Sequence, residues 1–371
     1  MRIVSPFLNK VFYPALAMAG VFHRASAAGL AVVTYHGVLP QGYEPIDAAL
    51  DGNLIGAEML RRQLRLLKAH YNVISPDDVL AWREERGALP PRAVLLTCDD
   101  GLLNCLTDML PVLQQEEVTC LFFVTGASVA ESRSTLWYEE LFLLFLLAPA
   151  GPFEISSVGL TIRGELRSSE PRSRKERRAL WWNSVKRLSQ VDEGARASFL
   201  AAARMQFGGQ RDSRQDKPAW WRRFGLLTRG ELRELAASGM TVGAHTLSHP
   251  MLSLLPAEEA YAEISESRIR LEGALPHRLW AFAYPFGNRE SVTPEVLAMP
   301  QKAGYEAAFV NFGGGLGVDL PPYALPRVHV TAEMNLAELE AHVSGFHVRM
   351  QQRAGRPTRT LGALCKNSPS K

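Results

Sequence analysis

Short apolar runs recur along this chain between segments whose apolar residues have the spacing of an amphipathic helix. Leu30–Tyr35 reads LAVVTY, residues 93–97 read AVLLT and residues 120–125 read CLFFVT, whereas the intervening Ala57–His70 has helical spacing. Strands that are apolar on both faces are typical of parallel sheets with helices on each side. With this many strand–helix units, we predict an α/β fold and a closed or partly closed barrel rather than an open sheet.

Other segments continue this alternation. Thr228 and Glu231 form the pattern of a capping box, which predicts a helix over residues 228–238. Further strands are predicted at residues 71–74, 240–244, 280–284 and 307–310, and further helices from Pro76 and over residues 102–115, 257–271 and 294–303. Residues 335–349 are expected to close the core.

The alternation divides the chain into three parts, with one interruption. We expect an N-terminal segment over residues 1–28, a barrel over residues 29–347 and a basic, disordered tail over residues 348–371. Residues 134–227 interrupt the barrel as a mainly helical insertion. It contains an apolar helix (136–147), a hairpin around residues 153–164 and a basic helix (173–188). The arginines of that helix are expected to form a solvated face, with a patch for a polyanionic glycan as the alternative.

Composition narrows the class of protein. An apolar fraction of 47% and a charged fraction of 21% describe a globular chain with a sizeable core. The net charge of +3 is small for 371 residues and no nucleic-acid-binding motif is present, so we expect no nucleic-acid partner. The cysteines show no C-x-x-C spacing, which favours a reducing compartment; they are Cys98, Cys105, Cys120 and Cys365.

The N-terminal segment has basic residues, an apolar stretch over residues 11–22 and small residues at 25–28. It fits a signal peptide about as well as an amphipathic helix resting on a membrane surface, and it is too short and interrupted to span a bilayer. Lys10, Pro14 and His23 break up the apolar run, which favours an uncleaved segment. We therefore expect a cytoplasmic or membrane-peripheral protein rather than an exported one, with peripheral membrane contact through this segment.

Chemically active side chains follow the predicted strands, and in such barrels the chemistry lies at the C-terminal ends of the strands. These residues are His36, Asp99, Asp100, His245, His249, Tyr284, Pro285, Arg327 and His329. The other histidines, His70, His277, His342 and His347, are expected to be ordinary surface or core residues, and most tryptophans of the insertion are expected to pack between helices.

The histidine pair and the aspartate pair together indicate a divalent metal. His245 and His249 are four residues apart, so on one helical turn they would face the same ion. Two imidazoles and one carboxylate leave positions open for water and substrate, which is the catalytic pattern. Consecutive aspartates cannot both point at one ion, so one would be a ligand and its neighbour a base. Zn²⁺ suits this donor set best, with Mn²⁺, Co²⁺ and Ni²⁺ as alternatives.

Three ordered motifs carry a family resemblance. Thr97–Gly101 reads TCDDG, residues 245–249 read HTLSH and residues 282–287 read FAYPFG. The chain resembles the NodB-type polysaccharide deacetylases, and within them the exopolysaccharide and poly-N-acetylglucosamine deacetylase branch. These are metal-dependent hydrolases that remove N-acetyl, sometimes O-acetyl, groups from carbohydrates. The resemblance implies a distorted, partly open (β/α) barrel with fewer strands than eight.

The resemblance also implies roles for individual residues. Asp99 would be the general base, and Asp100, His245 and His249 would hold the metal. The backbone N–H of Tyr284, next to Pro285, would stabilise the oxyanion.

Two positions depart from the family pattern. Cys98 replaces the usual aromatic residue, which we interpret as a change in packing behind the site. The C-terminal L-x-x-H motif of the general acid is missing. His36 and His329 are therefore both candidates for the acid, and His36 is favoured. Arg327 would orient a carboxylate or the substrate, or form a structural salt bridge.

Together these features predict metal-dependent hydrolytic deacetylation of an N-acetylated glycan. Two alternatives remain at this point: a deacylase that acts on a lipid-linked sugar, and a catalytically inactive glycan-binding module.

Overall fold

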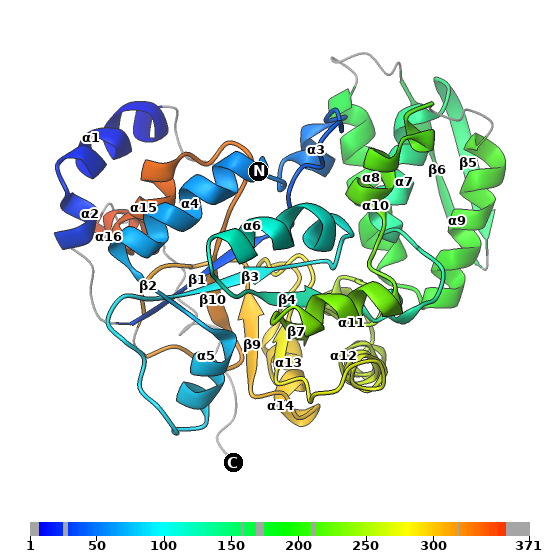
Figure 1. The fold of residues 1–371 in the computed structure, drawn as a ribbon. Helices are drawn as coiled ribbons and strands as arrows, with labels where there is room; N and C mark the ends of the chain where they lie inside the picture. The colour runs from blue at the N-terminus through cyan, green and yellow to red at the C-terminus, as the bar shows by residue number, and fades with distance from the viewer. Residues whose placement is uncertain are drawn as a thin grey trace.

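A closed parallel barrel forms the centre of the molecule in the computed structural model (Figure 1), which describes residues 7–24, 29–157, 159–167, 174–208, 213–317 and 319–353. The main sheet has eight strands in the order β1-β10-β9-β8-β7-β4-β3-β2. Because β1 also pairs with β3, seven strands close into a ring, and β2 lies outside it beside the first half of β3. The predicted α/β fold with a distorted (β/α) barrel of fewer than eight strands is confirmed.

The strands of this sheet are short, and all of them pair in parallel. They are β1 (Leu30–Tyr35), β2 (Asn72–Ile74), β3 (Ala93–Cys98), β4 (Leu121–Val124), β7 (Thr241–Ala244), β8 (Ala281–Ala283), β9 (Ala307–Val310) and β10 (Leu325–His329). Alternate residues face opposite sides of the ring. Val32 and Leu95, for example, lie in the cluster that fills the barrel, whereas Val33 and Leu96 pack in the outer core with the surrounding helices. Both faces are buried, which explains the continuous apolar runs in the sequence.

Helices cover the outside of the ring. They are α3 (Ala48–Asp51), α4 (Ala57–His70), α5 (Pro76–Arg83), η2 (Cys105–Met109), α6 (Leu110–Gln115), η3 (Gly126–Val129), α11 (Arg229–Ala237), η5 (Leu252–Leu254), α12 (Ala257–Glu272), α13 (Pro294–Leu297), α14 (Met299–Lys302), α15 (Leu336–Val343) and α16 (Phe346–Arg353). The capping box of Thr228 and Glu231 is present at the start of α11. Two predicted helices are each split in two, next to Pro111 and Pro300, because proline has no N–H to continue the helical hydrogen bonds.

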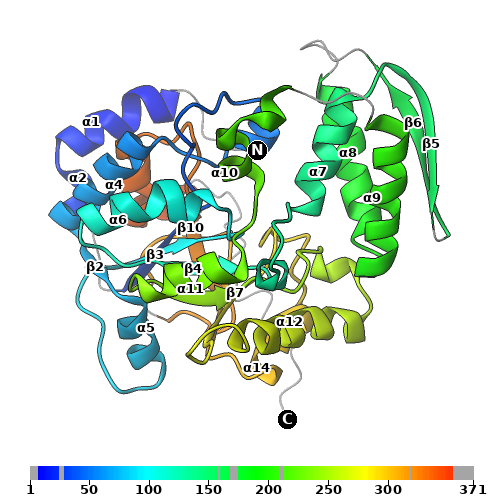
Figure 2. The same cartoon turned by 45° about the vertical axis from the view of Figure 1, so that its right-hand side comes forward.

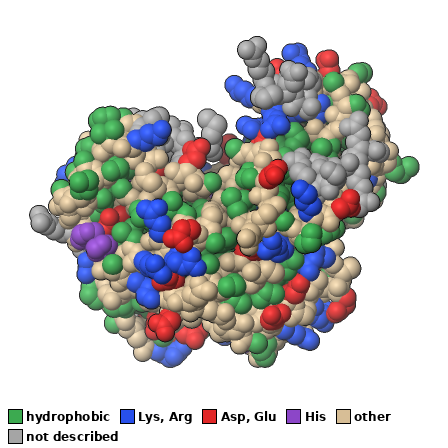
Figure 3. Space-filling model, turned by 45° about the horizontal axis from the view of Figure 1, so that its top comes forward, with side chains coloured by type: hydrophobic (Ala, Val, Ile, Leu, Met, Phe, Trp, Pro, Cys, Tyr) green, Lys and Arg blue, Asp and Glu red, His purple; other side chains and the backbone are tan. Residues whose placement is uncertain are grey.

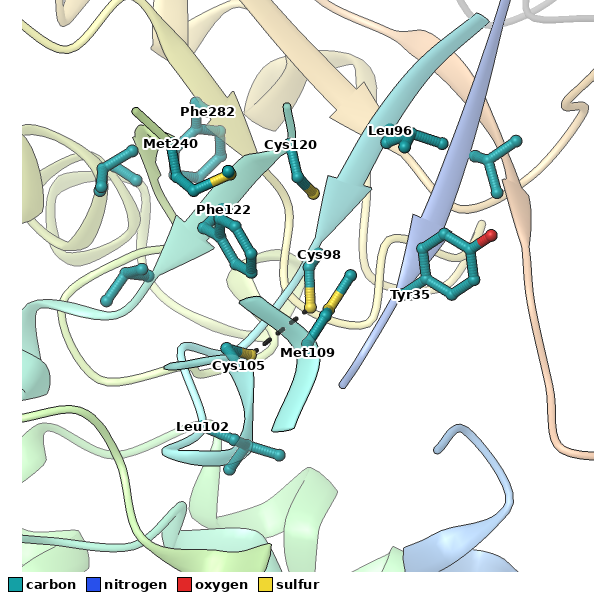
Figure 4. Packing of buried hydrophobic residues seen from close by; sticks show 14 of the residues in the cluster. Tyr35, Leu96, Cys98, Leu102, Cys105, Met109, Cys120, Phe122, Met240 and Phe282 are labelled. Carbon is teal, nitrogen blue, oxygen red and sulfur yellow. Dashed lines mark hydrogen bonds between the residues drawn. The ribbon is translucent and has the colours of Figure 1, made fainter. Parts of the chain in front are cut away.

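The three described cysteines lie in the outer core of the barrel. Cys98 and Cys105 face each other with their sulfurs 3.6 Å apart, surrounded by Tyr35, Met109 and Phe122 (Figure 4). Burial raises the pKa of the Cys98 thiol well above its usual range, and the neighbouring Cys105 raises it further. Cys98 is therefore a packing residue, as the sequence indicates, and points away from the barrel interior.

The segment between η3 and α11 forms a lobe beside the barrel (Figure 2). Its elements are α7 (Trp137–Leu147), β5 (Gly151–Ser157), β6 (Leu160–Leu166), α8 (Arg174–Leu188), α9 (Glu193–Phe207), η4 (Ser213–Asp216) and α10 (Pro218–Phe224). The antiparallel β5–β6 hairpin places Phe153, Ile155 and Ile162 in the core of the lobe. The sequence did not indicate α9 or α10.

The expectation that the arginines of the basic helix form a solvated face is wrong for Arg177. Its side chain is buried, and it donates hydrogen bonds to the carbonyls of Arg167 (2.7 Å) and Ala148 (3.0 Å), the second at the C-terminal end of α7. A cation at a helix C-terminus satisfies carbonyls that have no intrahelical partner and interacts favourably with the helix dipole. Arg177 therefore holds α7 and α8 together.

The N-terminal segment forms η1 (Leu8–Phe12), α1 (Tyr13–Met18) and α2 (Val21–Arg24), and it packs against the last two helices of the barrel. Tyr13 and Phe22 are fully buried there, and the Tyr13 side chain hydrogen-bonds to His347 (2.5 Å). Phe7, Val11 and Met18 are exposed, so membrane contact stays a prediction. No helix among the described residues combines the length and apolarity needed to cross a membrane. Helix α16 extends to Arg353, into the predicted tail, and residues 354–371 lie outside the described residues.

A buried ion cluster joins the lobe to the barrel, and we expect Arg223→Ala to lower the free energy of unfolding by about 3–5 kcal/mol. Arg223 is fully buried, and it donates hydrogen bonds to Asp51 (2.8 Å) and Glu139 (2.8 Å), which would be left as uncompensated charges. Denaturant unfolding measures the change. The neighbouring Arg222→Ala is the control, because Arg222 is partly exposed and its ion pair with Asp108 should contribute about 1 kcal/mol or less. Equal effects of the two changes would contradict this account.

Candidate active site

The polar residues that follow the strands meet at one end of the barrel. Asp99 and Asp100 follow β3, His245 and His249 follow β7, and His36 follows β1. His329 is the last residue of β10 and pairs in register with Thr34 of β1. Because all strands of the ring run parallel, their C-terminal ends lie at the same side, and the scattered sequence positions converge there.

Asp100, His245 and His249 form a buried group whose ligand atoms lie within 4.8 Å of one another. Asp100 Oδ1 is 3.6 Å from His245 Nε2 and 3.4 Å from His249 Nε2. Ligand atoms around a tetrahedral ion with bonds of about 2.0–2.2 Å are separated by about 3.4 Å, so the spacing fits a metal. His245 Nδ1 donates to the Ala283 carbonyl (2.7 Å), which leaves the Nε2 lone pair facing the group. Burial opposes ionisation of Asp100, but the two neighbouring histidines outweigh it and hold the Asp100 pKa well below its usual range.

The histidines lie on a loop, and the expectation that they share a helical turn is wrong. Thr246 and His249 have φ values of +63° and +61°. These values lie in the left-handed region, so the motif does not form a right-handed helical turn. Thr246 Oγ1 accepts a hydrogen bond from the His249 N–H (2.9 Å), and the indole N–H of Trp137 donates to the His249 carbonyl (3.2 Å). Asp100 and Phe286 also have positive φ, so non-glycine residues in the left-handed region gather at this end of the barrel.

Glu263 supports this loop from α12, which the sequence analysis missed. Its carboxylate accepts hydrogen bonds from the backbone N–H groups of Leu247 (2.9 Å) and Ser248 (2.8 Å). Arg196 of the lobe donates to the Ser248 hydroxyl (3.0 Å), so helix α9 also holds the loop. A signal was available, because Glu263 lies between Ala260 and Ile264 on the buried face of α12, where an unpaired carboxylate is costly.

Asp99 has a different set of partners from Asp100, as adjacent side chains require. Arg327 donates two hydrogen bonds to its carboxylate, both of 2.6 Å, and His36 Nε2 lies 4.0 Å from Asp99 Oδ2. Burial opposes ionisation, but the positive charge of Arg327 outweighs it and lowers the pKa of Asp99. Arg327 is itself fully buried, and its guanidinium orients the Asp99 carboxylate. Substrate binding by Arg327 stays a prediction.

The two candidate acid histidines lie side by side. The ring centroids of His36 and His329 are 4.8 Å apart. Burial lowers the pKa of His329 to about 3, and the neighbouring His36 lowers it further, so His329 is neutral at pH 7. His36 is partly exposed, and its Nε2 lies 4.0 Å from Asp99 Oδ2, an oxygen that also accepts a hydrogen bond from Arg327.

The expectation that Tyr284 supplies an oxyanion donor is wrong in this structure. The Tyr284 N–H donates to the Phe309 carbonyl (3.2 Å), and its hydroxyl donates to the Tyr323 carbonyl (2.9 Å). Tyr284 and Pro285 are both buried. Phe286 follows with a φ of +60°, and its N–H has no acceptor among the described residues. The Phe286 ring lies 4.9 Å from the His249 ring.

Aromatic side chains from the lobe line the histidine side of the site. The Tyr138 ring lies 4.9 Å from His249 and 5.6 Å from Phe286, and the Trp182 ring lies 5.5 Å from Phe286. Burial raises the pKa of Tyr138 well above its usual range, and the negative charge of Asp100 raises it further, so its hydroxyl stays protonated. The lobe therefore contributes both a positioning group, Arg196, and a wall of the site.

Comparison with known proteins points to one family. Residues 205–308, less than a third of the chain, match the family model described as polysaccharide deacetylase. Over that segment the chain is similar to the polysaccharide deacetylases. A curated relative, YxkH of Bacillus subtilis (strain 168), which carries the name polysaccharide deacetylase, is 26% identical over 120 residues. That match covers 32% of this chain and 42% of YxkH, so it spans less than half of the relative.

Solved structures share the fold of this chain at low identity. The Streptococcus pyogenes deacetylase PplD in complex with acetate is 15% identical, with a TM-score of 0.52 over 86% of this chain and 99% of that one. IcaB from Ammonifex degensii is 19% identical, with a TM-score of 0.51 over 85% and 97%. The de-N-acetylase from Aggregatibacter actinomycetemcomitans is 13% identical, with a TM-score of 0.51 over 85% and 99%.

The family match contains the histidine loop and the turn at Tyr284 but not the aspartate pair. The barrel places Asp99 and Asp100, which follow β3, beside the matched segment, because β3 pairs with β4 and β4 pairs with β7. Their place in the site therefore follows from the fold and the distances, independently of the family match.

Proposed function

We propose that this chain hydrolyses the N-acetyl groups of a glycan with the help of a divalent cation held by Asp100, His245 and His249. The observation that carries the proposal is the pair of distances from Asp100 Oδ1 to the two Nε2 atoms, 3.6 and 3.4 Å, with Asp99 beside them and turned to other partners. Two imidazoles and one carboxylate suit Zn²⁺, with Mn²⁺, Co²⁺ and Ni²⁺ as alternatives. When bound, such an ion acts as a Lewis acid that activates water and polarises a carbonyl group.

The protein's own groups then have separate tasks. Asp99 accepts the proton of the attacking water, and the two hydrogen bonds from Arg327 keep its carboxylate ionised and oriented. We assign the oxyanion contact to the backbone N–H of Phe286 in place of Tyr284, because it has no acceptor among the described residues and its ring contacts His249. Tyr138 and Trp182 supply an aromatic wall that can pack on a sugar ring.

His36 is our candidate for the acid that protonates the departing amine. We expect His36→Ala to lower the rate of acetate release by about 10²- to 10⁴-fold, the usual contribution of a general acid. His329→Ala should have a smaller effect, because the pKa of buried His329 is about 3, so its ring is neutral at pH 7 and holds no imidazolium proton to donate. Steady-state rates of the two variants at pH 7 provide the comparison. A larger loss in His329→Ala than in His36→Ala would reverse the assignment.

Glu263 acts through the histidine loop, so Glu263→Gln should weaken metal binding by about 10- to 100-fold, as is typical for partners of metal ligands. Glu263 Oε2 accepts from the N–H groups of Leu247 and Ser248, and Oε1 accepts from the Ser248 hydroxyl, so an amide removes one of these two acceptors. Competition with a chromophoric chelator measures the affinity. Glu259→Gln is the matched control, since Glu259 is exposed on the same helix. Equal metal affinities in the two variants would show that Glu263 does not position the loop.

The substrate is proposed as an N-acetylated glycan. The names of the structural neighbours support this class, because they describe a deacetylase in complex with acetate and a de-N-acetylase. A lipid-linked sugar is the second candidate, supported by the exposed Phe7, Val11 and Met18 of the N-terminal segment. Acetate release from N-acetylglucosamine oligomers, compared with release from lipid-linked saccharides, distinguishes the two.

The same assay tests the reaction itself. Acetate should be released from the oligomers by the metal-loaded protein, should stop after treatment with a chelator and should return when Zn²⁺ is restored. If the protein binds the glycan but releases no acetate with any of the metal ions tested, it is an inactive binding module and the proposal is overturned.

A further inference from the structure

A second group of metal-binding side chains lies away from the active site, where the N-terminal segment meets the barrel. His23 of α2, His70 at the end of α4 and Glu340 of α15 have ligand atoms within 4.8 Å of one another. We propose that these three residues bind a second divalent transition-metal ion, which fixes the N-terminal segment to the barrel. The proposal is independent of the deacetylase function.

The contact between His23 and Glu340 is the observation that points to a ligand. His23 Nδ1 lies 2.6 Å from Glu340 Oε1, yet both atoms are buried and neither has a partner in hydrogen-bond geometry. The Glu340 side chain is only 3% exposed, and a buried carboxylate oxygen without a hydrogen bond is costly. A cation between these two atoms would satisfy both, with the atoms moving apart to the spacing of about 3.4 Å between ligands of a tetrahedral ion.

The two imidazoles support the same interpretation. The rings of His23 and His70 are stacked, with centroids 3.8 Å apart and planes inclined by 22°. Ring nitrogens from two distant segments are thus brought to one buried carboxylate, with the ligand atoms within 4.8 Å of one another.

The ligands are held by rigid surroundings. Phe22, next to His23, is fully buried, and its ring lies 5.3 Å from Phe346 of α16. Leu339 and Ala341 flank Glu340 on α15 and are also fully buried. The three elements are thus packed together before any ion binds, which lowers the cost of assembling the site.

The site is open to solvent on one side. His23 keeps 30% of its side-chain exposure, and histidine side chains gather at the left edge of the molecule in Figure 3, the side on which α2 lies in Figure 1. Two imidazoles and a carboxylate leave at least one coordination position for water, and this donor set favours Zn²⁺. We expect the ion to be structural, because its three ligands come from three different helices, α2, α4 and α15.

Zinc stoichiometry of the full chain tests the proposal. After equilibration with Zn²⁺ and gel filtration, elemental analysis should give about two equivalents for the wild type and about one for His23→Ala and for Glu340→Gln. His277→Ala, a histidine outside both groups, should keep the wild-type value. Asp100→Asn should lose only the zinc bound at the active site and keep the one bound by His23, His70 and Glu340. The variant that loses an equivalent therefore shows which of the two sites held it. Unchanged stoichiometry in both His23→Ala and Glu340→Gln would overturn the proposal.

Hydrogen exchange gives a second measurement that does not depend on counting ions. In the Asp100→Asn background, Zn²⁺ should slow the exchange of backbone amides in α1 and α2, and the added change His23→Ala should remove that protection. Exchange in α1 and α2 that is the same with and without Zn²⁺ would contradict a metal bound between the N-terminal segment and the barrel.

Discussion

Asp99→Asn is expected to lower the rate of acetate release by about 10²- to 10⁴-fold while the active-site metal stays bound. The amide keeps the shape of the carboxylate but cannot accept a proton from water. Asp99 contacts Arg327 and lies near His36, whereas Asp100 faces the two histidines, so the change should leave the metal ligands in place. Acetate release and zinc content measured on the same preparation check both halves of the prediction. Retained turnover would remove Asp99 from the role of base.

Arg327 adds a pH dependence to this prediction. Because its charge lowers the pKa of Asp99, the ionised base persists to low pH, and activity is lost only as the pH falls through that lowered pKa. Arg327→Met should raise the pKa of Asp99 and move the acidic limb of the rate profile to higher pH. A structural role alone would lower the rate at every pH without moving that limb. Folding of the variant is checked by its unfolding transition, since Asp99 loses a buried partner.

His249→Ala should abolish measurable acetate release and weaken zinc binding at the active site by more than about 100-fold, beyond the effect of losing a partner of a ligand. The change removes one of only three protein ligand atoms, the one 3.4 Å from Asp100 Oδ1. Zinc competition titrations and acetate assays give the two readouts. His277→Ala serves as the control for loss of a histidine, because His277 belongs to neither metal-binding group. Wild-type zinc affinity in His249→Ala would exclude this histidine as a ligand.

The sequence predicts the framework of the site because its signals are local. A buried strand such as Leu30–Tyr35 is recognisable from its own residues, and the positions directly after such strands lie at the reacting end of the barrel. The convergence of Asp100 with His245 and His249 follows from this rule and from the motifs. The helical turn expected for the two histidines was wrong because Thr246 and His249 adopt a left-handed backbone that spacing alone does not reveal.

The rest depends on contacts between distant segments. At the turn after β8 we propose Phe286 instead of Tyr284 as the oxyanion donor, because the Tyr284 N–H donates to the Phe309 carbonyl of the neighbouring strand. Arg196 is separated from the loop that it supports by about fifty residues of sequence, and nothing near it indicates Ser248 as its partner. The basic helix gave the same difficulty, since Arg177 caps α7 from the inside although its sequence resembles that of its exposed neighbours.

The lobe is part of the active site as well as a neighbour of the barrel. Trp137 and Arg196 bind the histidine loop, and Tyr138 lies against His249. Arg223 ties the same lobe to Asp51 through a buried ion pair. Changes that loosen the lobe should therefore affect metal binding and glycan turnover together, because the loop that carries both histidines is held from two sides.

The central claim is that one divalent cation is bound jointly by Asp100, His245 and His249, and anomalous diffraction from zinc-loaded crystals tests it most directly. We predict a strong peak at the zinc edge between Asp100 Oδ1 and the two Nε2 atoms, at about 2.0–2.2 Å from each, with Asp99 still paired to Arg327. A fully loaded crystal with no peak there, or with zinc bound by Asp99 and Asp100 turned away, would contradict the account.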